Sequence, residues 1–248
     1  MLRDKIIVVT GAAKGMGEAH AAHLARQGAH VVMTDVDEAG SETARRIRDA
    51  GGSAEFHRLD VVDEHGWRAL VDSSVSRHGK VDGLVNNAGI LVRKPVDELS
   101  GDDWDALFDV NVKGTFLGCK HVLPAMQRAG GGSIVNVSSI SGMVANMPGM
   151  SAYCATKGAI RLFTKGLAVD YARYNIRANS VHPGTIRTPM TADFERDPEQ
   201  LRMLLGTTIL GRLGEATEVS EVVAFLLSGA ASFMTGAEVM VDGGFTAV

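Results

Sequence analysis

The chain has 248 residues, of which 45% are hydrophobic and 22% are charged, and its formal net charge is −4 at pH 7. This composition fits a single globular domain with a sizeable core and excludes a disordered chain. Charges of both signs are spread along the sequence without a basic stripe, which argues against nucleic acid or membrane partners. The sequence does not open on a targeting pattern, and no apolar run reaches the ~20 residues that cross a bilayer. We therefore expect a cytoplasmic protein that binds small molecules or other proteins.

The chain contains two cysteines, Cys119 and Cys154, and eight histidines. Two cysteines are too few for a disulfide scaffold, and no cysteines or histidines show the close spacing of a zinc site. We expect both cysteines to be buried as small hydrophobic residues. The alternative that Cys154 is a reactive thiol stays open, because it lies beside Tyr153. No histidine is predicted to bind a metal.

Short β-branched runs alternate with longer segments of helical period along the chain. The expected strands are residues 6–10, 30–34, 54–60, 83–86, 133–138, 176–181 and 238–241. Helical segments begin between them, near Gly15, Asp37, Glu64, Asp102, Ser151 and Glu218. Units of this kind cross over right-handed. The pattern therefore predicts an α/β protein with a Rossmann-type doubly wound, mostly parallel seven-stranded sheet and helices on both faces, formed by one domain over residues 1–248.

A glycine-rich turn, Thr-Gly-Ala-Ala-Lys-Gly-Met-Gly at residues 10–17, joins the first predicted strand to a helix. Glycine lets the backbone approach a pyrophosphate closely, and the free amides and dipole of a helix N-terminus favour negative charge. The spacing departs from the general Gly-x-Gly-x-x-Gly fingerprint, and by itself it fits a structural turn equally well. As a phosphate loop it would bind the cofactor through Gly11, Lys14, Gly15, Met16 and Gly17.

The second predicted strand leads to Asp35, which stands 18 residues after Gly17. This is close to the ~20 at which an acidic side chain meets the adenosine ribose of a dinucleotide. A carboxylate there accepts hydrogen bonds from both ribose hydroxyls and repels the 2′-phosphate of NADP, so NAD is the predicted cofactor. Two alternatives stay open, because Lys14 could reach a 2′-phosphate and Asp35 could simply cap the next helix.

Two further strand ends complete the expected cofactor pocket. Asp60 and Val61 end the third strand, where they can bond the adenine amino group. Asn87, Ala88 and Gly89 follow the fourth strand, where they either wall the pocket or turn the chain. Ligands of open α/β sheets bind at such carboxyl ends of strands, so these residues are expected to lie together.

Tyr153 and Lys157 are four residues apart at the start of a predicted helix, so their side chains share one face. A tyrosine ordinarily titrates near ~10. A positive charge ~4 Å away stabilises the phenolate by about 4 kcal/mol at an effective permittivity of ~20, which lowers the pKa by roughly 3. Together with an oxidised nicotinamide, Lys157 would bring the pKa of Tyr153 close to neutral pH, where a general acid/base works best. By itself such a pair usually lies on a solvated helix face, so the surrounding motifs decide whether this pair is catalytic.

Taken together, these motifs resemble those of the short-chain dehydrogenase/reductase family over essentially the whole chain. The motif residues are the turn at 10–17, Asn86 to Gly89, Asn111, Ser138, Ser139, Tyr153 to Lys157, Pro183, Gly184 and Thr188. The stretch 211–244 resembles that of NAD-dependent relatives acting on hydroxysteroids or cyclic secondary alcohols. Such relatives are commonly homotetramers, so the resemblance also implies a homotetramer.

The resemblance implies a role for each catalytic residue. Tyr153 would exchange a proton with the alcohol or ketone oxygen, and Lys157 would lower the pKa of Tyr153 and hold the nicotinamide ribose. Ser139 would hydrogen-bond the reacting oxygen, and Asn111 would hold, through its backbone, a water of a proton relay. The remaining cofactor contacts would be Pro183, Gly184, the backbone of Ile186 and Thr188, the last two at the carboxamide.

The position of the catalytic serine departs from the family pattern. In the family it usually stands thirteen residues before the tyrosine, where this chain has Ile140, whereas Ser139 stands fourteen before. The strand end and the Ser-x2-Gly pattern of residues 139–142 favour Ser139, with the extra residue absorbed between positions 143 and 149. Ser138 and Ser141 are the alternatives, and they otherwise form a strand end and a turn.

Residues 189–213 are longer than the loop of a simple α/β unit. They either form short helices that cover the core or act as a mobile apolar lid over a pocket for a hydrophobic substrate. Their apolar side chains are Met190, Phe194, Met203, Leu204, Leu205, Ile209 and Leu210. A second apolar strip at residues 222–227 fits either a subunit contact or the core.

We predict an NAD(H)-dependent oxidoreductase that interconverts a hydrophobic secondary alcohol, cyclic or hydroxysteroid-like, and its ketone by hydride transfer, with Tyr153 as general acid/base. One alternative is a 3-oxoacyl-carrier-protein reductase, which would use NADPH and is disfavoured by Asp35. Another is a non-catalytic nucleotide-sensing module, which Tyr153 and Lys157 disfavour.

Overall fold

A computed structural model of the protein describes residues 1–145, 147–192, 197–206 and 208–248. Seven strands form one parallel sheet in the order β3-β2-β1-β4-β5-β6-β9. They are β1 (Ile6–Thr10), β2 (His30–Asp35), β3 (Ser53–Arg58), β4 (Gly83–Asn86), β5 (Gly132–Val137), β6 (Ile176–Pro183) and β9 (Glu238–Val241). This order confirms the predicted doubly wound α/β fold.

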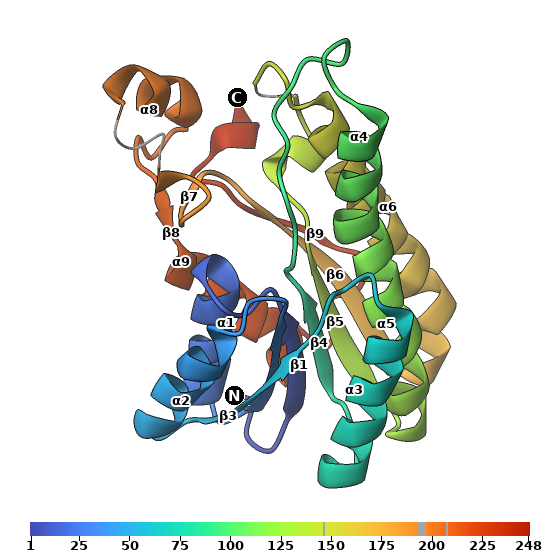
Figure 1. Ribbon diagram of the computed structural model, residues 1–248. Coiled ribbons are helices and arrows are strands. Elements are labelled where there is room, and N and C mark those ends of the chain that lie inside the picture. Colours follow the sequence, from blue (N-terminus) through green and yellow to red (C-terminus); the bar gives the residue numbers. More distant parts are fainter. Residues whose placement is uncertain (146, 193–196, 207) are drawn as a thin grey trace.

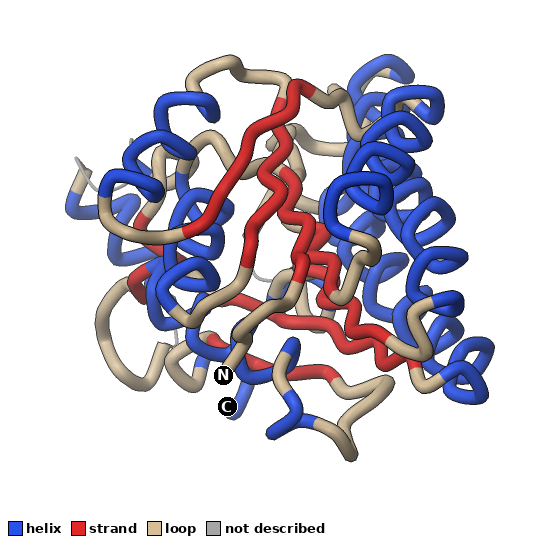
Figure 2. Tube along the Cα trace, turned by 90° about the horizontal axis from the view of Figure 1, so that it is seen from below, coloured by secondary structure: helices blue, strands red, loops and turns tan. Residues whose placement is uncertain are grey.

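Helices cover both faces of the sheet because successive strand side chains point to opposite faces. In β1, Ile7 and Val9 belong to one hydrophobic core, and Ile6 and Val8 belong to the other. The first face is covered by α1 (Gly15–Arg26), α2 (Gly40–Asp49) and α9 (Ala216–Leu227). The second is covered by α3 (Glu64–His78), α5 (Gly114–Arg128) and α6 (Ser151–Tyr171). Figure 1 shows these two groups of helices, and Figure 2 shows the strands between them from below.

The helical segment expected from near Asp102 is divided in two. α4 (Gly101–Phe108) is joined to α5 by a π-helical turn, Asp109–Lys113. Ser100 begins α4 through a capping box with Asp103. A π-helical turn shifts the register of the side chains that follow it and is frequent at functional sites. Here the turn contains Asn111, whose side chain is buried.

The strand order opens a crevice at the carboxyl ends of β1 and β4. These strands are neighbours, although β2 and β3 separate them in the sequence, so the connections leave them in opposite directions. β3 ends at Arg58 and not at Asp60 as expected. The Asp60 carboxylate accepts the Val62 amide and the Asp60 carbonyl accepts the Asp63 amide, which turns the chain toward α3.

The segment 189–213 connects the two strands of a second, two-stranded parallel sheet. β7 (Ile186–Arg187) pairs with β8 (Gly214–Glu215), which brings the two ends of the segment together. Between them lies α8 (Pro198–Leu205), next to β7 in Figure 1. Met190, Ile209 and Leu210 are exposed. Phe194 lies outside the described residues, as do the side chains of Met203 and Leu204.

The strip at residues 222–227 belongs mainly to the core. Val223, Leu226 and Leu227 of α9 are buried, whereas Phe225 is exposed. Across the described ranges, no helix combines the length and the apolar character that a membrane crossing requires.

Candidate active site

The carboxyl ends of β1, β2 and β4 and the turn after β3 open onto a cavity of about 570 Å³, a size typical of small-molecule sites. Both the glycine turn and the strand-end residues expected from the sequence contribute to its wall. The predicted cofactor residues that line it are Gly11, Lys14, Gly15, Met16, Asp35, Asp60, Val61, Asn87, Ala88, Gly89 and Thr188.

The glycine turn forms its side of the cavity with backbone. Gly11 and Gly15 both have φ +63°, a conformation that favours glycine. A β-carbon on Gly11 would lie 2.9 Å from the Cα of Ala88, and one on Gly17 would lie 2.0 Å from the carbonyl oxygen of Gly11. Gly17 does not line the cavity; it allows α1 to pack closely against the turn. The exposed amides at the start of α1 suit a phosphate group.

Asp35 ends β2 at the cavity wall. Its Oδ2 accepts the Ala13 amide and its Oδ1 accepts the Asp37 amide, both at 3.0 Å. The carboxylate therefore orders the turn after β2 and does not cap α2, whose N-cap residue is Ala39, so the alternative interpretation is wrong. Each oxygen keeps a further lone pair for a ligand. The Lys14 ammonium lies 3.4 Å from Asp37 Oδ2, so this cation is paired with Asp37.

Asn87 ties the turn after β4 to the glycine turn. Its Nδ2 donates to the carbonyl oxygens of Thr10 and Gly11 at 2.9 and 3.2 Å. Its Oδ1 is buried without a hydrogen-bond partner in the protein. A buried, unpaired acceptor in a cavity wall favours a ligand that carries donors, as the amide groups and hydroxyls of a dinucleotide do.

Tyr153 lies in the first turn of α6, and its side chain is hydrogen-bonded to Ser139, which follows β5. Burial raises the pKa of Tyr153 to about 12, while the hydrogen bond from Ser139 acts in the opposite direction. Desolvation of the phenolate dominates in the protein by itself, and the near-neutral pKa expected with a bound oxidised nicotinamide stays a prediction.

Lys157 is buried on the face of α6 that carries Tyr153. Its Nζ donates to the backbone carbonyl of Val137 at 3.0 Å and lies 5.6 Å from the centre of the Tyr153 ring. Burial lowers the pKa of Lys157 to about 8.

The three candidate serines have different surroundings. Ser138 Oγ donates to the Lys157 carbonyl at 2.8 Å, so this hydroxyl fixes the backbone of α6. Ser139 Oγ accepts the Ser141 amide at 3.1 Å and meets Tyr153. This geometry favours Ser139 over Ser138 and Ser141.

Burial raises the pKa of the half-buried Cys154 thiol, which favours the interpretation that Cys154 is a packing residue and not a reactive thiol.

Asn111 connects the π-helical turn to the cavity wall and to α6. Its Oδ1 accepts the Ile90 amide at 2.8 Å, and its Nδ2 donates to Thr156 Oγ1 at 3.1 Å. A β-carbon on Gly89 would lie 3.2 Å from Asn111 Oδ1 and 3.6 Å from Lys157 Nζ. The cavity wall at Gly89 therefore borders directly on the side chains of Asn111 and Lys157.

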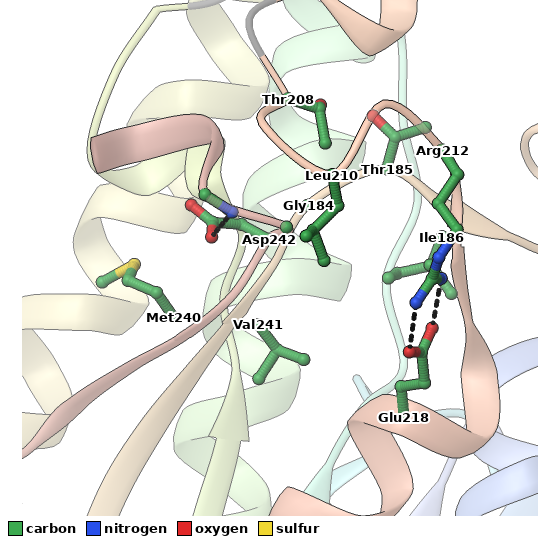
Figure 3. A pocket seen from close by; sticks show the side chains of 13 residues that line it. Gly184, Thr185, Ile186, Thr208, Leu210, Arg212, Glu218, Met240, Val241 and Asp242 are labelled. Atoms are coloured by element: carbon green, nitrogen blue, oxygen red, sulfur yellow. Dashed lines mark hydrogen bonds and ion pairs between the residues drawn. The ribbon is translucent and has the colours of Figure 1, made fainter. Parts of the chain in front are cut away.

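The remaining predicted cofactor contacts are divided between two cavities, and this separates Ile186 from Thr188, the two residues expected at the carboxamide. Thr188 lines the larger one, whereas Gly184 and Ile186 line a second cavity of about 300 Å³. Pro183 ends β6 beside them. Figure 3 shows this second cavity beneath Thr208 and Leu210, with the ion pair between Arg212 and Glu218 at its edge.

Several cavity residues escaped the sequence analysis. They are mostly apolar, and each is adjacent in sequence to a predicted residue at a strand end or in the π-helical turn. Adjacency at the sheet edge is therefore the signal that could have identified them. They are Val36, Asp37, Leu59, Ile90, Val110 and Pro189.

Comparisons with known proteins agree with this geometry. A family model described as enoyl-(acyl carrier protein) reductase matches residues 11–246. The cyclopentanol dehydrogenase of Comamonas sp. (strain NCIMB 9872) is 50% identical over 247 residues, covering 99% of this chain and 98% of that protein. The chain belongs to the short-chain dehydrogenase/reductase family.

Other members of the short-chain dehydrogenase/reductase family are similar over nearly the full chain. The 3-alpha-(or 20-beta)-hydroxysteroid dehydrogenase of Mycobacterium bovis (strain ATCC BAA-935 / AF2122/97) is 41% identical over 247 residues, covering 99% of this chain and 91% of that protein. A crystal structure of a gluconate 5-dehydrogenase from Burkholderia cenocepacia J2315, in complex with NADP and tartrate, matches with a TM-score of 0.95 and 38% identity, covering 100% of this chain and 97% of that chain. As a member of this family, the chain is an oxidoreductase that uses a nicotinamide cofactor.

Proposed function

We propose that this protein is an NAD(H)-dependent dehydrogenase that interconverts a hydrophobic secondary alcohol, cyclic or hydroxysteroid-like, and its ketone. The observation that carries the proposal is the hydrogen-bonded pair of Tyr153 and Ser139 beside the buried ammonium of Lys157. This group borders, through Asn111 and Gly89, on the cavity that contains the glycine turn and Asp35.

In alcohol oxidation, Tyr153 accepts the hydroxyl proton of the substrate. Ser139 positions the substrate oxygen: its Oγ accepts the Ser141 amide, and its hydrogen, directed to Tyr153 in the free protein, would be donated to the substrate oxygen. The Lys157 ammonium favours the phenolate form of Tyr153, and Asn111 holds a water of the proton relay through its backbone. A bound NAD⁺ supplies the hydride acceptor and a positive charge near the phenol. Ketone reduction follows the same steps in reverse.

The glycine turn and strand ends would hold the dinucleotide, and Asp35 would select NAD. Its carboxylate lies where a 2′-phosphate would meet like charge, at a cost of several kcal/mol. The pairing of Lys14 with Asp37 also occupies the cation that could otherwise attract that phosphate. The NADP-bound gluconate 5-dehydrogenase shows that related chains accept NADP, so the preference needs direct measurement.

The substrate class follows from the relatives and from the apolar segment 189–213. Two relatives at 50% and 41% identity are named for cyclopentanol and for hydroxysteroids. The exposed side chains of Met190, Ile209 and Leu210 support a lid that excludes water from a hydrophobic substrate.

A cytoplasmic homotetramer completes the proposal. Leu162 and Val169 on α6 and Phe233 after α9 are large apolar side chains with exposed fractions of 69%, 81% and 104%. Exposed apolar groups on two separate elements favour association between subunits.

The deciding experiment follows NADH formation with cyclopentanol, cyclohexanol, a 3-hydroxysteroid and an unbranched primary alcohol, each with NAD and with NADP. We expect oxidation of at least one cyclic secondary alcohol with NAD, weaker oxidation of the primary alcohol, and NADH consumption with the matching ketone. Turnover confined to NADPH and a 3-oxoacyl thioester would identify the carrier-protein reductase instead. NADH binding without turnover across the panel would identify a nucleotide sensor.

A further inference from the structure

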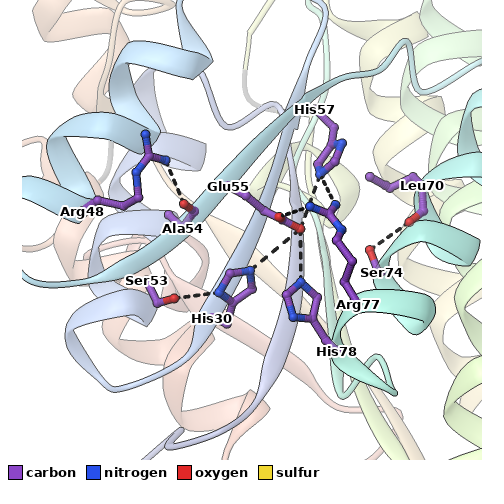
Figure 4. A network of polar contacts seen from close by, with 10 residues as sticks. All are labelled: His30, Arg48, Ser53, Ala54, Glu55, His57, Leu70, Ser74, Arg77 and His78. Carbon is purple, nitrogen blue, oxygen red and sulfur yellow. Dashed lines mark hydrogen bonds and ion pairs between the residues drawn. The ribbon is translucent and has the colours of Figure 1, made fainter.

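Two histidines and a glutamate meet at the end of the sheet opposite to the cofactor cavity. His30 begins β2, Glu55 lies in β3, and His78 ends α3 (Figure 4). One potential ligand atom from each side chain lies within 4.8 Å of the other two. Within the described part of the chain, this is the one such cluster of histidine, cysteine or acidic side chains.

The distances within the cluster suit a shared ion. The Nε2 atoms of His78 and His30 lie 3.3 and 3.8 Å from Glu55 Oε1. Zn²⁺ binds imidazole nitrogen and carboxylate oxygen at about 2.0–2.2 Å in tetrahedral geometry, so two of its ligand atoms stand about 3.4 Å apart. The distance from Glu55 Oε1 to His78 Nε2 matches this spacing, and the distance to His30 Nε2 exceeds it by about 0.4 Å.

The His30 ring leaves one nitrogen without a hydrogen bond. Its Nδ1 lies 2.6 Å from Ser53 Oγ, whereas its Nε2 is buried and too far from Glu55 for a hydrogen bond. In the tautomer whose Nδ1–H donates to Ser53, the Nε2 lone pair faces the lone pairs of the Glu55 carboxylate. Two acceptors directed at the same space are stabilised by a cation between them.

Outer contacts orient the cluster as they do in metal sites, where a partner commonly fixes each ligand. The Arg77 guanidinium donates to Glu55 Oε2 at 2.6 Å, while Glu55 Oε1 faces the Nε2 atoms of His78 and His57 at 3.3 and 3.4 Å. The guanidinium also donates to His57 Nε2 at 2.9 Å, so the lone pair of that histidine is already used. Because the Arg77 side chain is 44% exposed, solvent screens its charge from an ion beside Glu55.

Arg77 and His78 approach Glu55 to 2.6 and 3.3 Å, whereas His30 Nε2 lies 3.8 Å from Glu55 Oε1 without a hydrogen bond. We propose that His30, Glu55 and His78 form a Zn²⁺ site with a fourth position for water. Two imidazoles and one carboxylate are a donor set that zinc prefers. The sequence analysis assigned no metal ligand because these residues are separated by 25 and 23 positions and converge only in the folded chain.

The site would join the last turn of α3 to β2 and to the edge strand β3. Its ligands lie on the elements far from Tyr153, so the ion would stabilise the fold without taking part in catalysis. An ion that binds the native state at a free concentration of 100 times its Kd raises the Tm of a chain of this size by about 5–10 °C.

The test uses the full chain without a histidine tag, treated with chelator and then titrated with Co²⁺ or Zn²⁺. We expect one equivalent of Co²⁺ to give the visible absorption of a four-coordinate ion and to be displaced by Zn²⁺. We expect Zn²⁺ to raise the Tm. Absence of stoichiometric binding by the folded wild-type protein would overturn the proposal.

Three variants localise the ion: Glu55→Gln, His78→Ala and the matched control His65→Ala, which removes an exposed histidine from the first turn of α3. The first two should lose the Co²⁺ absorption and the Tm increase, whereas the control should keep both. Circular dichroism checks that each variant is folded, and the wild-type titration decides the matter if Glu55→Gln fails to fold. Unchanged binding in folded His78→Ala would place the ion elsewhere and contradict the assignment.

Discussion

His182 Nδ1 lies 3.0 Å from the backbone carbonyl oxygen of Ser139. Because a carbonyl only accepts, Nδ1 carries the hydrogen, and Nε2 accepts from Ser180 Oγ at 2.9 Å. Burial lowers the pKa of His182, which keeps the ring neutral. A side chain of β6 thus anchors the loop that carries the serine nearest to Tyr153.

Replacing His182 with Leu removes one of the two donors to the Ser139 carbonyl, which still accepts the Gly142 amide at 2.9 Å. We expect a loss of about 0.5–1.5 kcal/mol in the free energy of unfolding, the usual net contribution of one hydrogen bond. Denaturant unfolding followed by circular dichroism measures the loss. His182→Asn is the matched control, since its amide can donate from nearly the same position as Nδ1. Equal destabilisation by both variants would show that the hydrogen bond to Ser139 is not the cause.

Tyr153→Phe removes the proposed acid/base while keeping the ring. We expect kcat to fall by about 10²–10⁴, the usual contribution of general acid/base catalysis, with NADH affinity nearly unchanged. Steady-state kinetics and fluorescence titration of NADH measure the two quantities. Tyr171→Phe, at the other end of α6, should keep the wild-type rate. A Tyr153→Phe enzyme of near-normal rate would refute the assignment.

Asp35→Ala removes the carboxylate proposed to repel a 2′-phosphate. We expect the ratio of kcat/KM with NADP to that with NAD to rise at least about tenfold, because a like-charge contact costs several kcal/mol. Asp37→Ala provides the comparison, since Asp37 lies two residues after Asp35 and its carboxylate is paired with Lys14. It should change the ratio less. An equal change in both variants would show that Asp35 does not select the cofactor.

Lys157→Met tests the burial of a charge on α6. In the folded protein the pKa of Lys157 is lowered to about 8, so between that pH and its ordinary value of 10.5 the unfolded chain binds more protons than the native one. The penalty for the buried charge is therefore full below pH 8 and is relieved as the pH rises. Relative to the Met variant, the wild type should gain about 2 kcal/mol between pH 8 and 9.5.

Parallel denaturant titrations of the wild type and Lys157→Met across that interval measure the gain. A stability difference that stays constant with pH would contradict a desolvated ammonium at this position.

The sequence alone determined the features that depend on local spacing. Short β-branched runs between helical segments predicted the strands of the large sheet, and the central strand β1 is apolar and buried on both faces. The glycines of residues 10–17 and the acidic residue at 35 follow strand ends, so the sheet topology brings them to one cavity. The four-residue spacing of Tyr153 and Lys157 sets their common helix face.

Only the tertiary structure decided what depends on burial and on contacts between distant segments. It buried the side chains of Tyr153 and Lys157 together, and burial dominates the pKa of each. It distinguished Ser139 from Ser138 through their partners on α6. It also brought His30 and His78 to Glu55, a convergence that no spacing along the chain indicates, because side-chain proximity across strands and helices is set by packing.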